Sequence, residues 1–194
     1  MAYNNRESSR SGLGCLCNAL FKLIIFGGLS VFSFWLIFRP HRFKAYVNTA
    51  SLARFELADA NSTLQYNLSL DLAIRNPNRR IGIYYDRIEA TALYDGSQLS
   101  STTLPTFYQH PKNTTVLHPA FDGRSPALGT AATTFKREKG EGFFYMEVKA
   151  SAKIRLKVWF IKTRHFKPRI ACTVKIPAPA SSIPFESTKC HVDY

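Results

Sequence analysis

Hydrophobic residues are distributed differently in two regions of this chain. The first region is continuously apolar, so a helix formed by it would be apolar on every face. Residues 23–38 carry no formal charge, and the stretch extends back to residue 16 with few polar members. About 20 mostly apolar residues are needed to cross a bilayer as a helix. The pattern therefore predicts a transmembrane helix at 16–38 after a tail at 1–15. A cleaved signal peptide is the alternative, although its apolar region normally has only about 7–15 residues.

Beyond residue 39 the hydrophobic period falls to two, as in half-buried strands. Alternate residues from Leu64 to Ile74 are apolar, and a second long alternation runs from Met146 to Phe160. The second is too long for one flat strand, so a bulge is predicted near Ala150 and Ala152. The pattern from Ile81 to Tyr94 changes parity at Asp86, which predicts another bulge there.

Shorter apolar runs and turn residues complete this β-rich region. Asp95-Gly96 predicts a tight turn, and residues 125–135 have the character of one short helix. The further strands expected are Phe43–Asn48, Leu52–Asp59, Thr103–Tyr108, Thr114–His118 and Ile170–Ile176. Together these elements predict a mainly β fold, with an antiparallel sandwich of about seven strands and one short helix at 39–194.

Potential modification sites suggest which side of a membrane this region occupies. Arg6, Arg10 and Lys22 on the amino-terminal side equal in number Arg39, Arg42 and Lys44 on the other, so the positive-inside rule does not decide the orientation. Glycosylation sequons begin at Asn61, Asn67 and Asn113, all after the apolar stretch. We therefore expect a cytosolic amino terminus and an extracellular domain at 39–194.

The four cysteines agree with this orientation. Cys15 and Cys17 lie at the start of the apolar stretch, where S-palmitoylation is common. Cys172 and Cys190 lie in the β-rich region and are the candidates for one disulfide in an oxidising compartment.

Three blocks of sequence carry a resemblance to a known family. The first runs from Asn76-Pro77-Asn78 to Tyr84-Tyr85-Asp86, and the others span 105–115 and 185–194. They resemble the NDR/HIN-like family of plant membrane proteins, whose members carry a late-embryogenesis-abundant type 2 domain. The resemblance implies a seven-stranded sandwich at the plasma membrane and an association with plant defence and stress signalling. For the first block two interpretations stay open: a packing motif at a strand corner, or a partner-binding loop.

Motifs for catalysis or cofactor binding do not occur. The histidines are scattered, and 39–194 has neither His-Glu-x-x-His nor Cys-x-x-Cys, so no metal site is expected. Gly-x-Ser-x-Gly and nucleotide-binding glycine loops are absent as well. The sequence predicts a protein that is not an enzyme and needs no cofactor.

Charge is the remaining clue to function. The chain has 26 Lys and Arg against 13 Asp and Glu, a net charge of +13. Residues 135–169 hold a large share of this excess, and four basic residues share one face of the long strand: Lys149, Lys153, Arg155 and Lys157. One interpretation is a solvated face. The other is a face that binds an anionic ligand, either lipid headgroups or acidic polysaccharide, while nucleic acid is not expected outside the cell.

The sequence thus favours a single-pass plasma-membrane protein of plant defence or stress response. Its expected partners are the lipid bilayer, other membrane or wall proteins, and an anionic polymer or headgroup. The alternative is a binder of an apolar ligand within the sandwich core, and a third idea, membrane stabilisation during dehydration, rests only on analogy with the domain.

Overall fold

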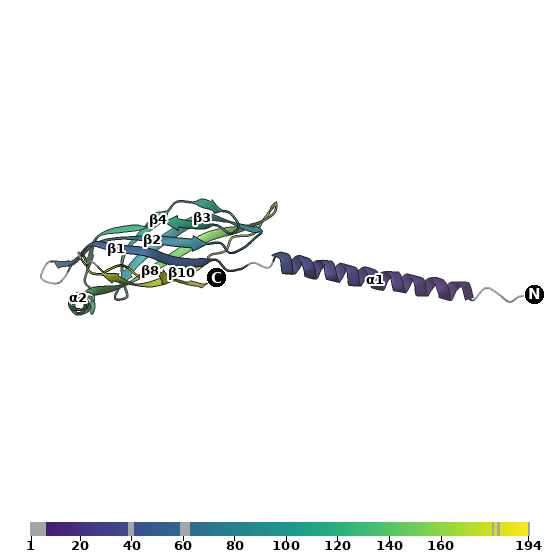
Figure 1. Cartoon of the computed structure of the whole chain (residues 1–194), viewed down its shortest axis with the longest axis horizontal. Helices are drawn as coiled ribbons and strands as arrows, with labels where there is room; N and C mark the ends of the chain where they lie inside the picture. The colour runs from purple at the N-terminus through teal and green to yellow at the C-terminus, as the bar shows by residue number, and fades with distance from the viewer. Residues whose placement is uncertain (1–6, 39–40, 59–62, 180, 182, 194) are drawn as a thin grey trace, which may run out of the picture. The chain divides into compact units, whose positions relative to one another are not determined.

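The computed structural model describes residues 7–38, 41–58, 63–179, 181 and 183–193 (Figure 1). Within 7–38 it describes the side chains of residues 18–33. The chain forms two compact units, Met1–Pro40 and His41–Tyr194, which are treated separately.

The first unit contains one helix, α1 (Glu7–Phe38), which covers the predicted helical stretch. Its described apolar side chains are exposed; Phe26, for example, is 73% exposed. Among the residues that the structure describes, however, no helix is long and apolar enough to cross a membrane. The predicted span at 16–38 extends beyond the residues whose side chains the structure describes, 18–33, and stays a prediction.

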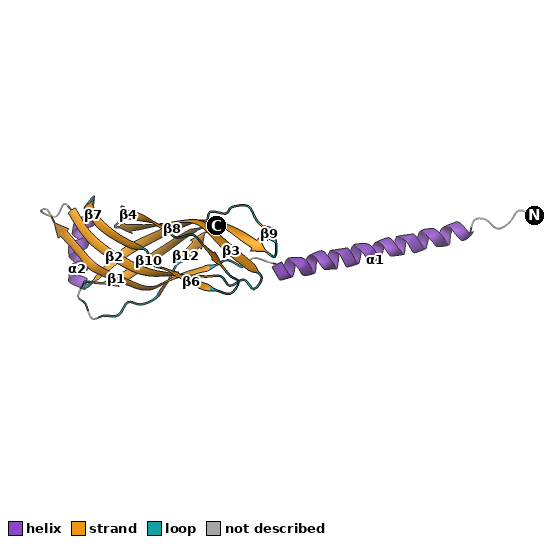
Figure 2. Ribbon diagram, turned by 90° about the horizontal axis from the view of Figure 1, so that it is seen from above, coloured by secondary structure: helices purple, strands orange, loops and turns teal. Residues whose placement is uncertain are grey.

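The second unit is a sandwich of two antiparallel sheets, as predicted (Figure 2). The five-stranded sheet has β2 (Thr63–Arg75) at its centre, paired with β1, β6 and β7. The seven-stranded sheet has β8 and β3 (Ile81–Tyr94) at its centre. The other members of the first sheet are β1 (Lys44–Ala58), β6 (Thr114–Leu117), β7 (Ala120–Pro126) and β11 (Thr188–Lys189). Those of the second are β4 (Ser97–Leu104), β5 (Phe107–Gln109), β8 (Phe143–Val158), β9 (Ile161–Lys162), β10 (Arg169–Pro177) and β12 (His191–Asp193).

The long alternations predict strand faces well but misplace one bulge. Every second residue of β2 from Leu64 to Ile74 is buried, as expected. In β3 the pairing with β8 shifts between Tyr85 and Arg87, which confirms the bulge at Asp86. The bulge expected near Ala150 and Ala152 is wrong, because β8 pairs with β10 in unbroken register over that region. The register shift in the pairing of β3 with β8 lies in β3, between Tyr85 and Arg87.

The count and limits of the shorter elements also differ from expectation. Twelve strands, instead of about seven, occur in the described residues. Strands β4 and β7 were not expected, because β4 is polar and largely exposed and β7 contains Gly123. The predicted helix at 125–135 begins later, as α2 (Ala131–Glu141), because residues up to Pro126 pair with β2. Gly142, with φ 79°, caps it in the left-handed conformation that glycine tolerates best.

The two sheets enclose one hydrophobic core, whose buried residues all lie between Phe43 and Cys190. At the α2 end the core is aromatic. Phe55 packs edge-on against Phe144 and Tyr94, with ring centroids 4.7 and 5.0 Å apart. Phe135 of α2 joins this cluster. Figure 2 shows α2 and β9 at opposite ends of the sandwich.

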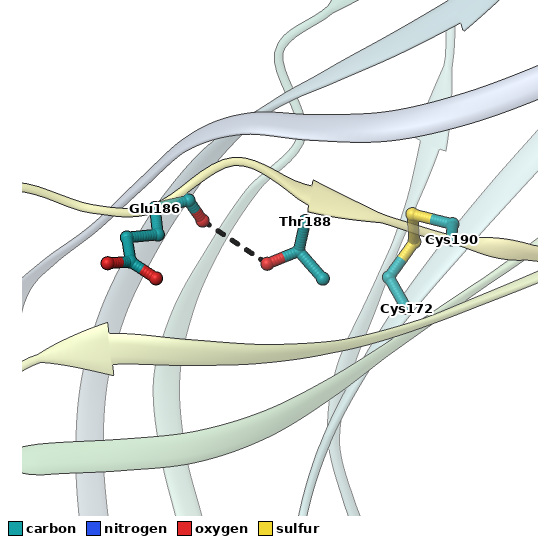
Figure 3. The surroundings of a disulfide bond; sticks show 4 residues. All are labelled: Cys172, Glu186, Thr188 and Cys190. Carbon is teal, nitrogen blue, oxygen red and sulfur yellow. Dashed lines mark hydrogen bonds between the residues drawn. A yellow bond between two sulfur atoms is a disulfide. The ribbon is translucent and has the colours of Figure 1, made fainter.

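A disulfide joins Cys172 and Cys190 where the carboxy-terminal segment crosses from one sheet to the other (Figure 3). Before the crossing, β11 pairs with β1 in the five-stranded sheet; after it, β12 pairs with β10 in the seven-stranded sheet. At the crossing itself, the Cys190 backbone amide donates to the Ala45 carbonyl at 3.0 Å. Both sulfur-bearing residues are buried. The predicted pairing is confirmed, and it ties the two sheets together at one edge.

Candidate anionic-ligand face

The asparagines of the family block form a buried polar network at the β9 end of the sandwich. The Asn76 side chain donates to the carbonyls of Ile81 and His110 at 2.8 and 3.2 Å. Its oxygen accepts from the backbone and side-chain nitrogens of Asn78. The Asn78 side chain in turn exchanges two hydrogen bonds with the backbone of His41, at 2.6 and 2.8 Å. Because Asn76 and Asn78 are almost fully buried, these bonds satisfy groups that water does not reach.

The tyrosines of the same block divide between the core and the surface. Tyr85 is buried and donates from its hydroxyl to the Gln109 side-chain oxygen at 3.3 Å. Tyr84 stacks obliquely on Tyr108, with centroids 4.5 Å apart. A Cβ added at Gly82 would lie 2.1 Å from the Tyr108 hydroxyl. Glycine is therefore required at 82 for Tyr108 to lie across the strand.

Asp86, at the bulge, is bound by Arg155 of the long strand and lies close to His165, which follows β9. Arg155 donates to both of its carboxylate oxygens, at 2.8 and 2.6 Å, and His165 lies 3.4 Å away. The Arg155 hydrogen bonds, followed by the charges of Arg155, His165 and Lys153, hold the pKa of Asp86 below its usual value. The geometry favours the structural interpretation of the family block, because its residues bond mainly to one another and to neighbouring strands.

The four predicted basic residues do lie on one strand, but they differ in how they are engaged. Lys149 pairs with Glu147 at 2.9 Å, and Arg155 is committed to Asp86. The Lys157 ammonium lies over the Tyr108 ring, 5.6 Å from its centroid. Lys153 is exposed and makes no ion pair within the described residues. Of the four, Lys153 is thus the one best placed to meet an external anion.

Lys153 opens onto a basin of about 460 Å³ on the outer face of the seven-stranded sheet. Three neighbouring cations also line it, namely Arg87, Lys167 and Arg169. Arg87 forms an ion pair with Glu89, the basin's acidic member, whereas the described residues contain no ion pair of Lys167 or Arg169. The full lining is Arg87, Glu89, Ser151, Ala152, Lys153, Lys167 and Arg169.

The basin contains three cations that the sequence did not single out. Lys167 and Arg169 follow the strand on which the prediction concentrated, and Arg87 belongs to a different strand. Strand pairing could have found part of the group, since Arg87 lies opposite Lys153 and Arg169 opposite Ser151. Cations gathered around one concavity attract anions more strongly than the same charges dispersed over a surface. The arrangement is thus chemically suited to bind carboxylate or phosphate groups.

Two observations bear on the alternative of an apolar ligand. The inward-facing residues pack as a single cluster. The basin and a second cavity, bordered by Arg54, Asn67, Asp122 and Arg124, are lined mainly by polar and charged residues. Sites for apolar ligands are lined mainly by hydrophobic residues, so neither cavity has that character.

The modification sites are only partly covered by the described residues. Asn67 is exposed on the outer face of β2, and Asn113 is exposed in the loop before β6. Asn61 and the side chains of Cys15 and Cys17 lie outside the described residues. Glycosylation and palmitoylation stay predictions.

Comparison with known proteins identifies the family. The family model described as "Late embryogenesis abundant protein" (LEA_2) matches residues 71–172. NDR1/HIN1-like protein 10 of Arabidopsis thaliana is 40% identical over 91% of this chain and 82% of its own length. NDR1/HIN1-like protein 3 of the same plant is 37% identical over 94% and 81%, and protein 2 is 39% identical over 82% and 69%. The family is not one of known enzymes. With its LEA_2 domain and its similarity over most of its length, this chain belongs to the NDR1/HIN1-like family.

Proposed function

We propose that this protein acts in plant stress or defence responses as a non-enzymatic recognition protein at the cell surface. Its sandwich would lie outside the cytosol and bind an acidic polysaccharide, of which polygalacturonate is the simplest example, through the basin. The observation that carries the proposal is the group of Lys153, Lys167 and Arg169 around one concavity. Since none of the three makes an ion pair within the described residues, their charges are available to a ligand.

The chemistry of the basin favours a polymer of carboxylates over an isolated anion. Several exposed cations spread over an open concavity each gain little from a single charge. A polyanion instead meets them together, so its weak contacts add up through one chain. The binding should therefore weaken steeply as salt increases.

Charge reversal in the basin tests this proposal. The full-length triple variant K153E/K167E/R169E should bind immobilised polygalacturonate about tenfold or more weakly than the wild type. Arg155 is left unchanged, because its loss would uncouple Asp86 and disturb the fold. The matched control is R79E/R80E/K136E, which makes the same change in net charge at exposed residues that do not line the basin. Equal binding by the wild type and the basin variant would refute the proposal, as would equal losses in both variants.

Residence outside the cytosol is a separate part of the proposal. The Cys172–Cys190 bond supports it, since disulfides persist in oxidising compartments. The exposed sequons at Asn67 and Asn113 support it as well. Protein from plant tissue should lose apparent mass on glycosidase treatment, and N67Q/N113Q should reduce that loss. An unchanged mass in both would contradict glycosylation at these residues.

Association with the plasma membrane, and acylation of Cys15 and Cys17, form the last part. Membrane fractions should contain the protein, and extraction with alkaline carbonate would distinguish an integral from a peripheral association. C15S/C17S should lose thioester-linked acyl groups and should shift part of the protein out of the membrane fraction. Recovery of the wild type in the soluble fraction alone would refute this part.

A further inference from the structure

The hairpin that connects β8 to β9 exposes three large hydrophobic side chains in a row. Trp159 is 77% exposed, Phe160 76% and Ile161 59%. The two aromatic rings lie against each other, with centroids 5.4 Å apart. Exposed apolar clusters of this kind mark sites of contact with another surface.

The backbone at the tip has a conformation that a tryptophan rarely adopts. Trp159 has φ 56°, in the left-handed region that favours glycine and asparagine. Its side chain is mostly exposed, so burial in the core does not offset this unfavourable conformation. An outlier of this kind, held in place by its surroundings, is a reasonable starting point for a hypothesis of function.

The hairpin is held firmly, so its tip is a fixed feature. Val158 pairs with Ile161 and Lys157 with Lys162. At the base, Thr163 and Leu156 exchange two hydrogen bonds of 2.9 Å, one of them through the Thr163 hydroxyl. Below them Phe166 and Ile154 exchange two backbone bonds, also of 2.9 Å. The apolar residues are therefore presented at low entropic cost to a partner.

Cations surround the apolar tip. From residue 157 to residue 167 the sequence contains no Asp or Glu. Lys162 lies over the Tyr84 ring, 4.9 Å from its centroid, and Lys157 lies over Tyr108. Arg164 is exposed next to them. Aromatic residues at the tip with basic residues behind them match the layers of a phospholipid surface, in which acyl chains lie beneath phosphate groups.

The hairpin also lies at the end of the sandwich where the chain enters it. Val158 pairs with Ile81, whose carbonyl accepts from Asn76, and the linked Asn78 holds His41. The first described residue of the second unit and the base of the hairpin thus belong to one rigid end, where Figure 2 shows β9.

We propose that this hairpin inserts Trp159, Phe160 and Ile161 into the headgroup region of a phospholipid bilayer, while Lys157, Lys162 and Arg164 meet lipid phosphates. The apolar side chains supply the depth of insertion, and the cations supply a preference for anionic lipid. This surface is distinct from the basin and does not depend on polysaccharide binding.

Tryptophan fluorescence tests the proposal in the full-length chain. The protein contains two tryptophans, Trp35 in α1 and Trp159 in the hairpin. The W35F variant therefore leaves Trp159 as the sole fluorescent tryptophan, and α1 contributes no tryptophan signal. With vesicles of phosphatidylcholine and phosphatidylserine, Trp159 emission should move to shorter wavelength, and lipids brominated along their acyl chains should quench it. Phosphatidylcholine alone should give a weaker response.

Variants separate the hairpin from the rest of the molecule. In the W35F background, F160S/I161S should weaken the Trp159 response about tenfold or more, measured as the lipid concentration at half effect. The control L128S/I183S removes exposed apolar side chains elsewhere and should leave the response unchanged. Unshifted and unquenched Trp159 emission with either vesicle would overturn the proposal. A Trp159 response to polygalacturonate instead of vesicles would also overturn it.

Discussion

The buried family block differs from the outer face of the seven-stranded sheet and its β8–β9 hairpin in how the polar side chains are engaged. In the family block, Asn76 and Asn78 are buried and bond to three separate chain segments. On the outer face and the hairpin, cations and aromatic rings are exposed, and several have no ion-pair partner within the described residues. The block that identifies the family thus stabilises the fold, and the candidate binding surfaces lie beside it.

The largest effect is expected from breaking the buried network. N76A removes the hydrogen bonds of the Asn76 side chain to the Ile81 and His110 carbonyls and to the two Asn78 nitrogens, so we expect a loss of about 4 kcal/mol in the free energy of unfolding. Chemical denaturation measures it. N67A replaces an exposed asparagine on β2, serves as the control and should change stability little. A small effect of N76A would show that the network is not what stabilises this end.

The disulfide should come second. C172A/C190A removes a cross-link between residues 18 apart in sequence, which should lower the unfolding free energy by about 3 kcal/mol. The same loss should appear when the wild type is unfolded under reducing conditions, and reductant should not affect the variant's unfolding. If reductant destabilised both proteins equally, another reducible group would be responsible.

Acid should weaken the Asp86 contacts. Because the folded state holds the pKa of Asp86 below its usual value, the stabilisation is complete above that usual value and is lost as the pH falls through the lowered pKa. D86N should therefore be less stable than the wild type at neutral pH, and the difference should narrow below about pH 4. D122N, in which the replaced carboxylate makes no ion pair within the described residues, is the control. A constant difference across this range would contradict the linkage.

The smallest effect, and one of opposite sign, is expected at the exposed hairpin. W159N should leave the protein as stable as the wild type or more stable by about 1 kcal/mol, because asparagine tolerates positive φ better than tryptophan does. Thermal unfolding measures it. A clear loss of stability would show that Trp159 serves the fold, and would weaken the contrast between the two regions.

The sequence alone determined the features that depend on local pattern. Period-two alternation identified the inward faces of β2 and β8, because successive side chains on a strand point to opposite sides whatever the strand packs against. The parity change placed the bulge at Asp86, and the motif blocks identified the family. Cysteine usage predicted the Cys172–Cys190 bond, since only these two lie in the β-rich region.

Tertiary structure decided the features that depend on which strands become neighbours. The sequence of β4 is polar and shows little hydrophobic alternation, so it becomes recognisable as a strand only through its pairing with β3. The basin forms only because β3, β8 and β10 lie side by side, which brings together Arg87, Lys153, Lys167 and Arg169. Arg155 forms an ion pair with Asp86 instead. Charge along a sequence thus indicated the region of interest. Pairing between strands distant in sequence determined which cations neutralise each other and which remain exposed to a ligand.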